Sequence, residues 1–270
     1  MISPVSNCSQ KQSFFDTAAA RSKLARHNMK NSSKVFLSAE WLDLVFLNYL
    51  VEPSLLIPYV PTGTAVDSYQ GKTHLSLVGF CFCKTELWGK FSVPFHTEFQ
   101  EVNLRFYVRR EVGSELRRGV VFIKEIVPKL AIALTARLVY GENYVSLPMK
   151  HKIVEDAGKT DVEYSWRHNG AWSRLFARSA EKPKLPAENS LEQYITEHYW
   201  GYSRQKSGHT LEYHVTHVPW RVQVASEARW EGEAAALYGT EFGSVLARQP
   251  DSAYIASGSP VEVLKGSVIA

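Results

Sequence analysis

The stretch over residues 99–109, FQEVNLRFYVR, constrains the fold more than any other part of the sequence. Apolar and polar side chains alternate along it without interruption. One set is apolar: Val102, Leu104, Phe106 and Val108. The other set is polar: Glu101, Asn103, Arg105, Tyr107 and Arg109. Because successive side chains of a β-strand project to opposite faces, this segment is predicted to be a strand with one apolar and one polar face.

The polar face of this strand allows two interpretations. On an ordinary half-buried strand it would simply face solvent. However, a carboxylate, an amide, a guanidinium and a phenol in succession are suited to hydrogen-bonding one another or a small polar ligand. If the sheet curls, this face would line a cavity.

Length and charge limit the class of protein. A chain of 270 residues with 45% hydrophobic residues can bury one large core or two smaller ones, and we favour one β-rich domain. The net charge of +4 divides unevenly: residues 1–34 hold six basic residues and one acidic residue, whereas the rest holds 25 basic and 26 acidic residues. The body therefore carries no basic footprint for a polyanion, and no nucleic-acid partner is predicted.

The first 33 residues are predicted to be a disordered basic arm, because they are rich in Ser, Asn, Lys and Ala. The same bias is typical of an organelle transit peptide, so import remains open. Three cysteines form no even disulfide framework, which favours a reducing, cytoplasmic location. No apolar run approaches the roughly 20 residues that span a bilayer, so no membrane association is predicted.

Periodicity and turn residues predict the remaining elements. The predicted strands cover 41–51, 73–82, 117–127, 144–154, 161–168, 171–180, 202–205, 210–217, 221–230 and 261–264. A helical turn is predicted over 53–57, and helices over 128–140, 191–199 and 234–237. Pro128 at the start and Gly141 beyond the end are typical of a helix. Asn169-Gly170 indicates a hairpin, and Ser190 followed by Gln193 resembles a capping box.

Several of these stretches, in their order and spacing, resemble the YqjF-like family of uncharacterised proteins, which is grouped by fold with acetoacetate decarboxylase. They are TAVDSYQGKTHLSLVGF, FQEVNLRFYV, RRGVVFIKEI, ARLVYGENY, LEQYITEHYWGYSR and HVTHVPW. The resemblance covers about residues 35–266. It implies a single domain over residues 34–267 with a β-rich α+β fold: a closed or nearly closed antiparallel β-barrel or cone, with a few flanking helices and a central cavity.

The resemblance also implies which chemistry is absent. In the decarboxylase a strand glutamate lies in the cavity, and Glu101 is similar in placement. The essential decarboxylase residue is a lysine that forms a Schiff base with a keto acid, and Tyr144 stands where that lysine is expected. A phenol cannot form an imine, so we do not expect a Schiff-base decarboxylase.

The first candidate site combines Glu101, Asn103 and Arg105 on one strand face, where neighbouring positions lie about 7 Å apart. Arg105 would anchor a carboxylate or enolate, Glu101 would accept or return a proton, and Asn103 would orient one of them. The alternative is an internal salt bridge between Glu101 and Arg105 that only fixes the interior.

Further candidate ligand-binding residues are Tyr107, Arg118, Tyr140, Tyr144 and His217. Arg118 would add a cation or serve only a turn, and the tyrosines would present hydroxyls or simply pack. His217 would lie at the cavity mouth or hold the turn before Trp220. His214 and His217 are three apart in a strand and hence on opposite faces, so no metal site is predicted.

Two functions from different classes remain open. The first is an enzyme that acts on a small carboxylate or keto compound, with Glu101 and Arg105 as catalytic residues. The second is a non-catalytic protein that binds a small organic ligand in the same cavity. No dinucleotide, phosphate-loop or nucleophile-elbow motif is present, so no cofactor is predicted. The sequence leaves the oligomeric state open, a homo-oligomer included.

Overall fold

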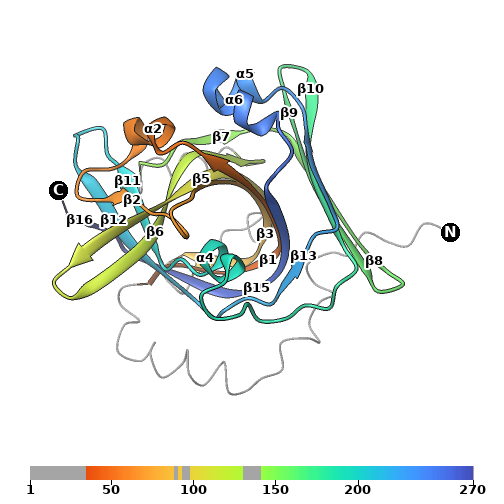
Figure 1. Ribbon diagram of the computed structural model, residues 1–270, viewed down its shortest axis with the longest axis horizontal. Helices are drawn as coiled ribbons and strands as arrows, with labels where there is room; N and C mark the ends of the chain where they lie inside the picture. Colours follow the sequence, from red (N-terminus) through yellow and green to blue (C-terminus); the bar gives the residue numbers. More distant parts are fainter. Residues whose placement is uncertain (1–34, 88–90, 93–97, 130–140, 270) are drawn as a thin grey trace.

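A computed structural model describes residues 35–87, 91–92, 98–129 and 141–269 (Figure 1). The predicted arm over 1–33 lies outside the described residues, as does nearly all of the helix predicted over 128–140. Within these described residues the main sheet has twelve strands: β1 Val35–Val51, β2 Ala65–Val66, β3 Thr73–Leu87, β4 Phe91–Ser92, β5 Phe99–Val112, β6 Glu115–Val127, β7 Tyr144–Ser146, β11 Trp200–Arg204, β12 Thr210–His217, β13 Val222–Val224, β15 Ser252–Leu264 and β16 Ser267–Val268.

A second sheet and a few short helices complete the described fold. The second sheet has the order β14-β10-β9-β8, with β8 Met149–Asp156, β9 Lys159–His168, β10 Ala171–Ser179 and β14 Glu227–Glu231. The helices are α2 Pro53–Leu56, the 3-10 turn η3 Ile57–Tyr59, α4 Leu191–Thr196, α5 Ala234–Tyr238 and α6 Thr240–Leu246. None of the described helices is long and apolar enough to cross a membrane.

The main sheet curls nearly into a ring. Its path runs β13-β15-β1-β3-β5-β6-β11-β12-β16, and β12 also pairs with β15, where His217 lies opposite Val261 (Figure 1). The predicted β-rich fold with few helices is confirmed. Most neighbours are antiparallel as expected, but β6 pairs in parallel with both β7 and β11.

The apolar face of β5 packs outward against the second sheet. Its alternating apolar residues share one hydrophobic cluster with Tyr164, Trp166 and Leu175 and with residues of α5 and α6. The two sheets approach closely at Gly79 of β3, where an added Cβ would lie 2.6 Å from a ring carbon of Tyr164. A larger residue at position 79 would therefore force the sheets apart.

The opposite face of the main sheet encloses a second, aromatic cluster. It includes Phe46, Phe80, Phe99 and Trp220, together with Ile195 of α4. In Figure 1, α4 lies within the curve of the main sheet, whereas α5, α6 and the second sheet lie outside it.

Ser190 caps the start of α4 as predicted, because its side chain accepts a hydrogen bond from the Gln193 backbone N–H. The Gln193 side chain, however, accepts its hydrogen bond from the Asn189 N–H and not from that of Ser190, so the reciprocal half of the predicted capping box is displaced by one residue. The helix ends earlier than predicted, at Thr196. The Asn169-Gly170 hairpin is also confirmed: both residues have positive φ, and His168 pairs with Ala171.

Other predicted boundaries were wrong. The strand predicted over 144–154 divides around Pro148, which has no N–H to donate to a ladder, and its halves join different sheets. The segment 221–230 likewise divides between the two sheets as β13 and β14. The last long strand begins at Ser252 and not near 261, since Gly258 and Pro260 interrupt its apolar pattern. Helix α6 was not predicted.

Candidate functional site

A cavity of about 200 Å³ lies on the inner face of the main sheet. It is smaller than the roughly 300–1,000 Å³ pockets of drug-sized ligands, so it suits a small molecule. Most of its lining is aromatic or aliphatic. Its polar lining residues are Thr85, Glu101, Asn103, Arg105, Glu125, Glu142, Tyr144, Thr196, His198, Tyr213 and His217.

The polar face of β5 supplies the centre of this lining. Glu101, Asn103 and Arg105 all face the cavity and are 3%, 1% and 8% exposed, respectively. Strand alternation explains this placement, because the sheet curls with this face inside. No ion pair joins Glu101 to Arg105 among the described residues, so the salt-bridge alternative lacks its contact.

We name one group of these residues the acidic end: Glu101, Asn103, Glu125, Glu142 and Tyr144. Glu101 Oε1 accepts a hydrogen bond from Asn103 Nδ2 (3.0 Å), and Glu101 Oε2 accepts one from the Tyr144 hydroxyl (3.1 Å). Glu125 lies opposite Asn103 on β6. Glu142 Oε1 accepts a hydrogen bond from the Tyr213 hydroxyl (3.0 Å). Three carboxyl groups are thus gathered at one end of the cavity.

Burial governs the protonation of these carboxyl groups. Desolvation raises the pKa of Glu101 to about 7, although Asn103, Tyr144 and Arg105 partly counteract it. Desolvation raises the pKa of Glu142 to about 8. Burial and the neighbouring Glu142 and Glu101 raise the pKa of Glu125 well above its usual range. The group therefore holds protons near neutral pH and titrates as a unit.

We name Arg105, His198 and His217 the basic end. The only hydrogen bond that Arg105 makes in the described structure is a long one from Nη2 to the Ile195 carbonyl (3.4 Å), and its Nε has no partner. Its guanidinium lies 5.3 Å from the Phe46 ring centroid and 5.8 Å from that of Tyr107. The described carboxylates include no ion-pair partner for it, so Arg105 is a buried cation without an anion.

Both histidines of the basic end are held neutral. The His198 ring stacks on that of Tyr107, with the ring centroids 4.6 Å apart. Burial is the main cause that keeps the pKa of His198 well below its usual range, and the positive charge of Arg105 is the second. His217 stacks on Trp220 (4.2 Å) and donates from Nδ1 to the Val218 carbonyl (2.9 Å). Burial lowers the pKa of His217 to about 4. His217 therefore both holds the turn and lines the cavity.

The remaining predicted site residues lie elsewhere. The Tyr107 hydroxyl shares a hydrogen bond with Ser76 Oγ (2.7 Å), and the residue is absent from the cavity lining. Arg118 is half exposed and contacts Asp67 (Nε to Oδ2, 3.3 Å). Tyr140 lies outside the described residues. In the described part of the chain, no group of three or more His, Cys, Asp or Glu side chains could hold a metal ion.

Six polar residues of the cavity were not predicted from the sequence: Thr85, Thr196 and the titratable Glu125, Glu142, His198 and Tyr213. The register between β5 and β6 shifts between Leu104 and Arg105, and the irregularity brings Glu125 to the inner face, although it belongs to an otherwise apolar run. Tyr213 reaches Glu142 because its ring lies over Gly201, where a Cβ would be 2.1 Å from Cζ. A charge inside the run FIKEIV was the one available signal for this group.

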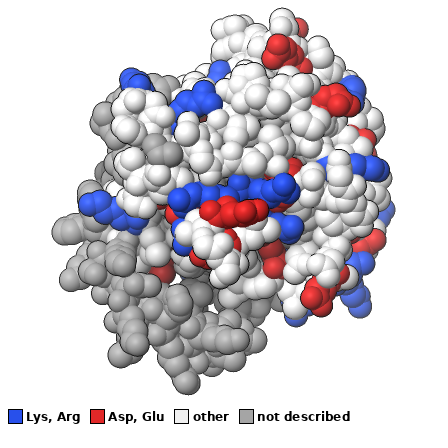
Figure 2. Space-filling model, turned by 60° about the vertical axis from the view of Figure 1, so that its left-hand side comes forward, with Lys and Arg blue, Asp and Glu red and all other residues white. Residues whose placement is uncertain are grey.

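On the outer surface near the β5–β6 hairpin, basic side chains are paired with acidic ones. Glu212 receives hydrogen bonds from Arg110 Nη1 (2.8 Å) and Arg117 Nη1 (2.6 Å). Figure 2 views the left-hand side of Figure 1 and shows basic side chains beside acidic ones in its central row. These contacts account for the basic side chains near the β5–β6 hairpin without a ligand.

Solved structures define the fold class. An acetoacetate decarboxylase from Legionella pneumophila superposes with a TM-score of 0.61 at 12% identity, covering 87% of both chains. An acetoacetate decarboxylase-like enzyme from Sphingomonas wittichii RW1 gives 0.62 at 12% identity, covering 88% of this chain and 94% of that one. The enduracididine biosynthesis enzyme MppR in complex with pyruvate gives 0.62 at 13% identity, covering 88% and 90%. The chain therefore has an acetoacetate decarboxylase-like fold.

Sequence comparison then gives the family. Residues 38–260 match the profile of DUF2071, described as an uncharacterized conserved protein, and the chain belongs to this family. The uncharacterized protein YqjF of Bacillus subtilis is 27% identical over 190 residues, which cover 68% of this chain and 74% of YqjF. The YqjF-like resemblance is thus confirmed.

Proposed function

We propose that the cavity binds a small organic carboxylate or keto compound, with Arg105 as its anion anchor and Glu101 as an acid/base group. The observation that supports this proposal is the state of Arg105, which is buried, faces the cavity and has no carboxylate partner among the described residues. A buried charge without a partner is costly, and a bound carboxylate would supply two oxygens to the guanidinium.

The environment of Glu101 suits proton transfer. Its pKa of about 7 means that protonated and ionised forms are both populated near neutral pH, which favours general acid–base catalysis. The Tyr144 hydroxyl donates to Glu101 and would hold the carboxylate in one orientation.

Imine chemistry is not part of the proposal. Tyr144 occupies the cavity where the resemblance predicts the Schiff-base lysine, and the described cavity lining includes no lysine. Lys150 is exposed and lies over the Trp172 ring, 4.6 Å from its centroid. Borohydride treatment in the presence of a keto acid should therefore leave the mass of the protein unchanged, and a stable adduct would contradict this part of the proposal.

A binding screen tests the proposal. The screen consists of short keto, hydroxy and simple carboxylic acids, pyruvate among them. We expect at least one of these acids to raise the melting temperature of the wild-type protein. The variant Arg105→Met should weaken binding of that acid by about thirtyfold or more, since buried charge pairs contribute about 2–5 kcal/mol. Arg109→Met is the matched control, because Arg109 is on the same strand but 47% exposed. If no acid stabilises the protein, the proposal fails.

A non-catalytic binding protein is the second candidate, because the largely apolar cavity with one buried cation suits binding without chemistry. Glu101→Gln separates the two. If the protein is an enzyme, this variant should keep ligand affinity within about tenfold of wild type and abolish turnover, because proton transfer by Glu101 stabilises the transition state and not the bound ligand. Conversion of the bound acid by the wild type, followed by NMR, would favour the enzyme; an unchanged ligand would favour the binding protein.

A further inference from the structure

The acidic end holds two buried acceptor atoms for which the described residues supply no donor. Asn103 Oδ1 and Glu125 Oε2 make no hydrogen bond within the described part of the chain, and their residues are only 1% and 2% exposed. The two residues lie directly opposite each other on β5 and β6, and both line the cavity. Directly opposite residues in an antiparallel pair have Cβ atoms about 5 Å apart. One small group in the cavity can therefore reach both oxygens.

The amide and phenol donors described at this end are already engaged. Asn103 Nδ2 and the Tyr144 hydroxyl donate to Glu101, and the Tyr213 hydroxyl donates to Glu142. Buried acceptors in native proteins are nearly always satisfied, by protein groups, water or a ligand. The protonated carboxyl groups of this end can supply O–H donors themselves, so a ligand that binds here must bring N–H or O–H donors and displace such a proton.

The charges around these acceptors favour a cation over a neutral donor. Glu101, Glu125 and Glu142 influence one another electrostatically, and removal of a proton from any of them leaves a negative charge in a desolvated site. An ammonium group offers three donors and a positive charge, whereas a hydroxyl offers one donor and no charge.

We propose that the ligand is bipolar: its carboxylate binds Arg105, and a primary amine binds between Asn103 and Glu125. This inference rests on the proposed function, in which Arg105 anchors the carboxylate of the ligand. Asn103 and Arg105 are two residues apart on one strand face, which separates their backbones by about 7 Å. The amine is therefore several bonds from the carboxylate, as in an ω-amino acid.

Matched pairs of ligands test the inference on the full-length wild-type protein by calorimetry. The pairs are β-alanine with propionate, γ-aminobutyrate with butyrate, δ-aminovalerate with valerate, and ε-aminocaproate with caproate. In at least one pair the amino acid should bind about tenfold tighter than the plain acid, because charge-assisted hydrogen bonds are the strong ones. Its binding should also release up to about one proton near pH 7, as a cation lowers the pKa of neighbouring carboxyl groups.

The variant Glu125→Gln should reduce the advantage of the amino acid over its matched plain acid to about twofold or less, with both affinities measured on the same variant. Glu115→Gln is the matched control, because Glu115 lies on the same strand but its side chain is 53% exposed. If Glu125→Gln does not fold, the proton release of the wild type carries the test, as it needs no variant.

The outcomes separate the two proposals. If plain acids bind in an Arg105-dependent manner and no amine improves binding or releases a proton, this inference is wrong and the proposed function stands. The acidic end then holds only water. If neither the plain nor the amino acids bind, the proposed function fails and this inference fails with it.

Discussion

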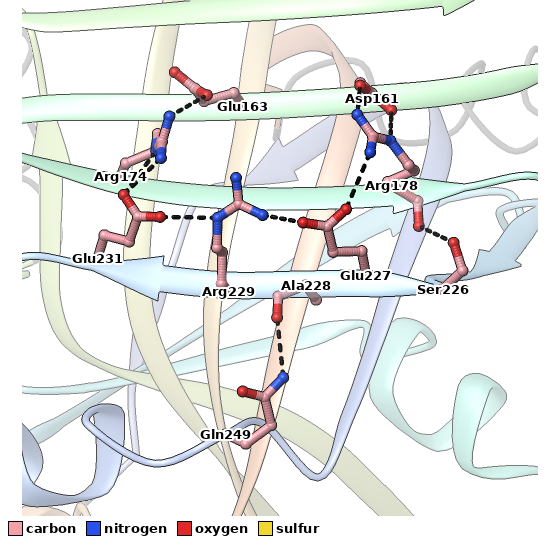
Figure 3. A network of polar contacts seen from close by, with 10 residues as sticks. All are labelled: Asp161, Glu163, Arg174, Arg178, Ser226, Glu227, Ala228, Arg229, Glu231 and Gln249. Atoms are coloured by element: carbon pink, nitrogen blue, oxygen red, sulfur yellow. Dashed lines mark hydrogen bonds and ion pairs between the residues drawn. The ribbon is translucent and has the colours of Figure 1, made fainter.

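The cavity and the outer face of the second sheet both contain arginine close to acidic side chains, yet they satisfy these charges differently. On the outer face, Arg174 contacts Glu231 (2.6 Å) and Glu163 (3.4 Å). Figure 3 shows that this network continues across three strands, with Arg229 between Glu231 and Glu227. In the cavity, Arg105 has neither a carboxylate partner among the described residues nor free access to solvent.

This difference separates arginines that carboxylates already pair from an arginine that has no carboxylate partner among the described residues. The outer arginines are about 40% exposed, so water and carboxylates share their solvation, and their net contribution to stability is small. Arg105 loses water without gaining an anion from the described residues, and the proposed carboxylate ligand would supply that anion. The unpaired charge, and not the number of charges, identifies the candidate site.

The pH dependence of stability should differ between the two regions. Glu101 in the folded protein has a pKa of about 7, above its ordinary 4.5, so the folded state holds a proton that the unfolded state lacks between these values. Its contribution to stability is therefore lost as pH rises toward 7. The outer carboxyls Asp161 and Glu231 have lowered pKa values, and their contribution is lost only as pH falls below about 4.

We expect the stability of Glu101→Gln relative to wild type to rise by about 2–3 kcal/mol between pH 5 and pH 8. The comparison with wild type is needed because the buried His198 and His217, with lowered pKa values, act in the opposite direction over part of this range. Urea unfolding at both pH values measures the difference. A difference that stays constant with pH would show that Glu101 is already ionised at pH 5.

Arg105→Met should stabilise the ligand-free protein by about 1–2 kcal/mol, because it replaces a buried cation that has no anion among the described residues by an unbranched apolar side chain. The aromatic rings of Phe46 and Tyr107 would contact the methionine. Urea unfolding without ligand tests this expectation. A clear loss of stability would mean that the ring contacts and the Ile195 carbonyl already compensate the charge.

The sequence allowed the fold to be predicted further than the site. Alternation over 99–109 and the hairpin and capping signals each depend on local geometry, and the structure confirms them. Two members of the acidic end, Glu125 and Glu142, could not be predicted, because Glu125 faces inward only through the register shift on β6, and Glu142 is reached only because Gly201 leaves room for Tyr213. Both depend on contacts between segments far apart in the chain.

The second predicted cation also shows this limit. Arg105 was predicted as the anion anchor and Arg118 as a further cation or a turn residue, and Arg118 lies at the surface beside Asp67. The two-residue period of a strand predicts which face of the sheet a side chain lies on. How deeply that side chain is buried depends on the curvature of the whole sheet. Burial and pairing are properties of the assembled sheet.

The smallest expected effect is that of Arg174→Met, which removes an arginine of the outer charge network on the second sheet. Arg174 is 37% exposed and shares its two carboxylates with solvent, so we expect a loss of no more than about 0.5 kcal/mol, which shrinks further in high salt. Affinity for any ligand of the cavity should not change, because the outer face of the second sheet and the cavity lie on opposite sides of the main sheet. Urea unfolding at low and high salt, with Arg105→Met in parallel, makes the measurement. A loss above about 1 kcal/mol would mean that the outer network acts cooperatively. The presence or absence of a carboxylate partner would then not be enough to tell a functional arginine from a surface arginine.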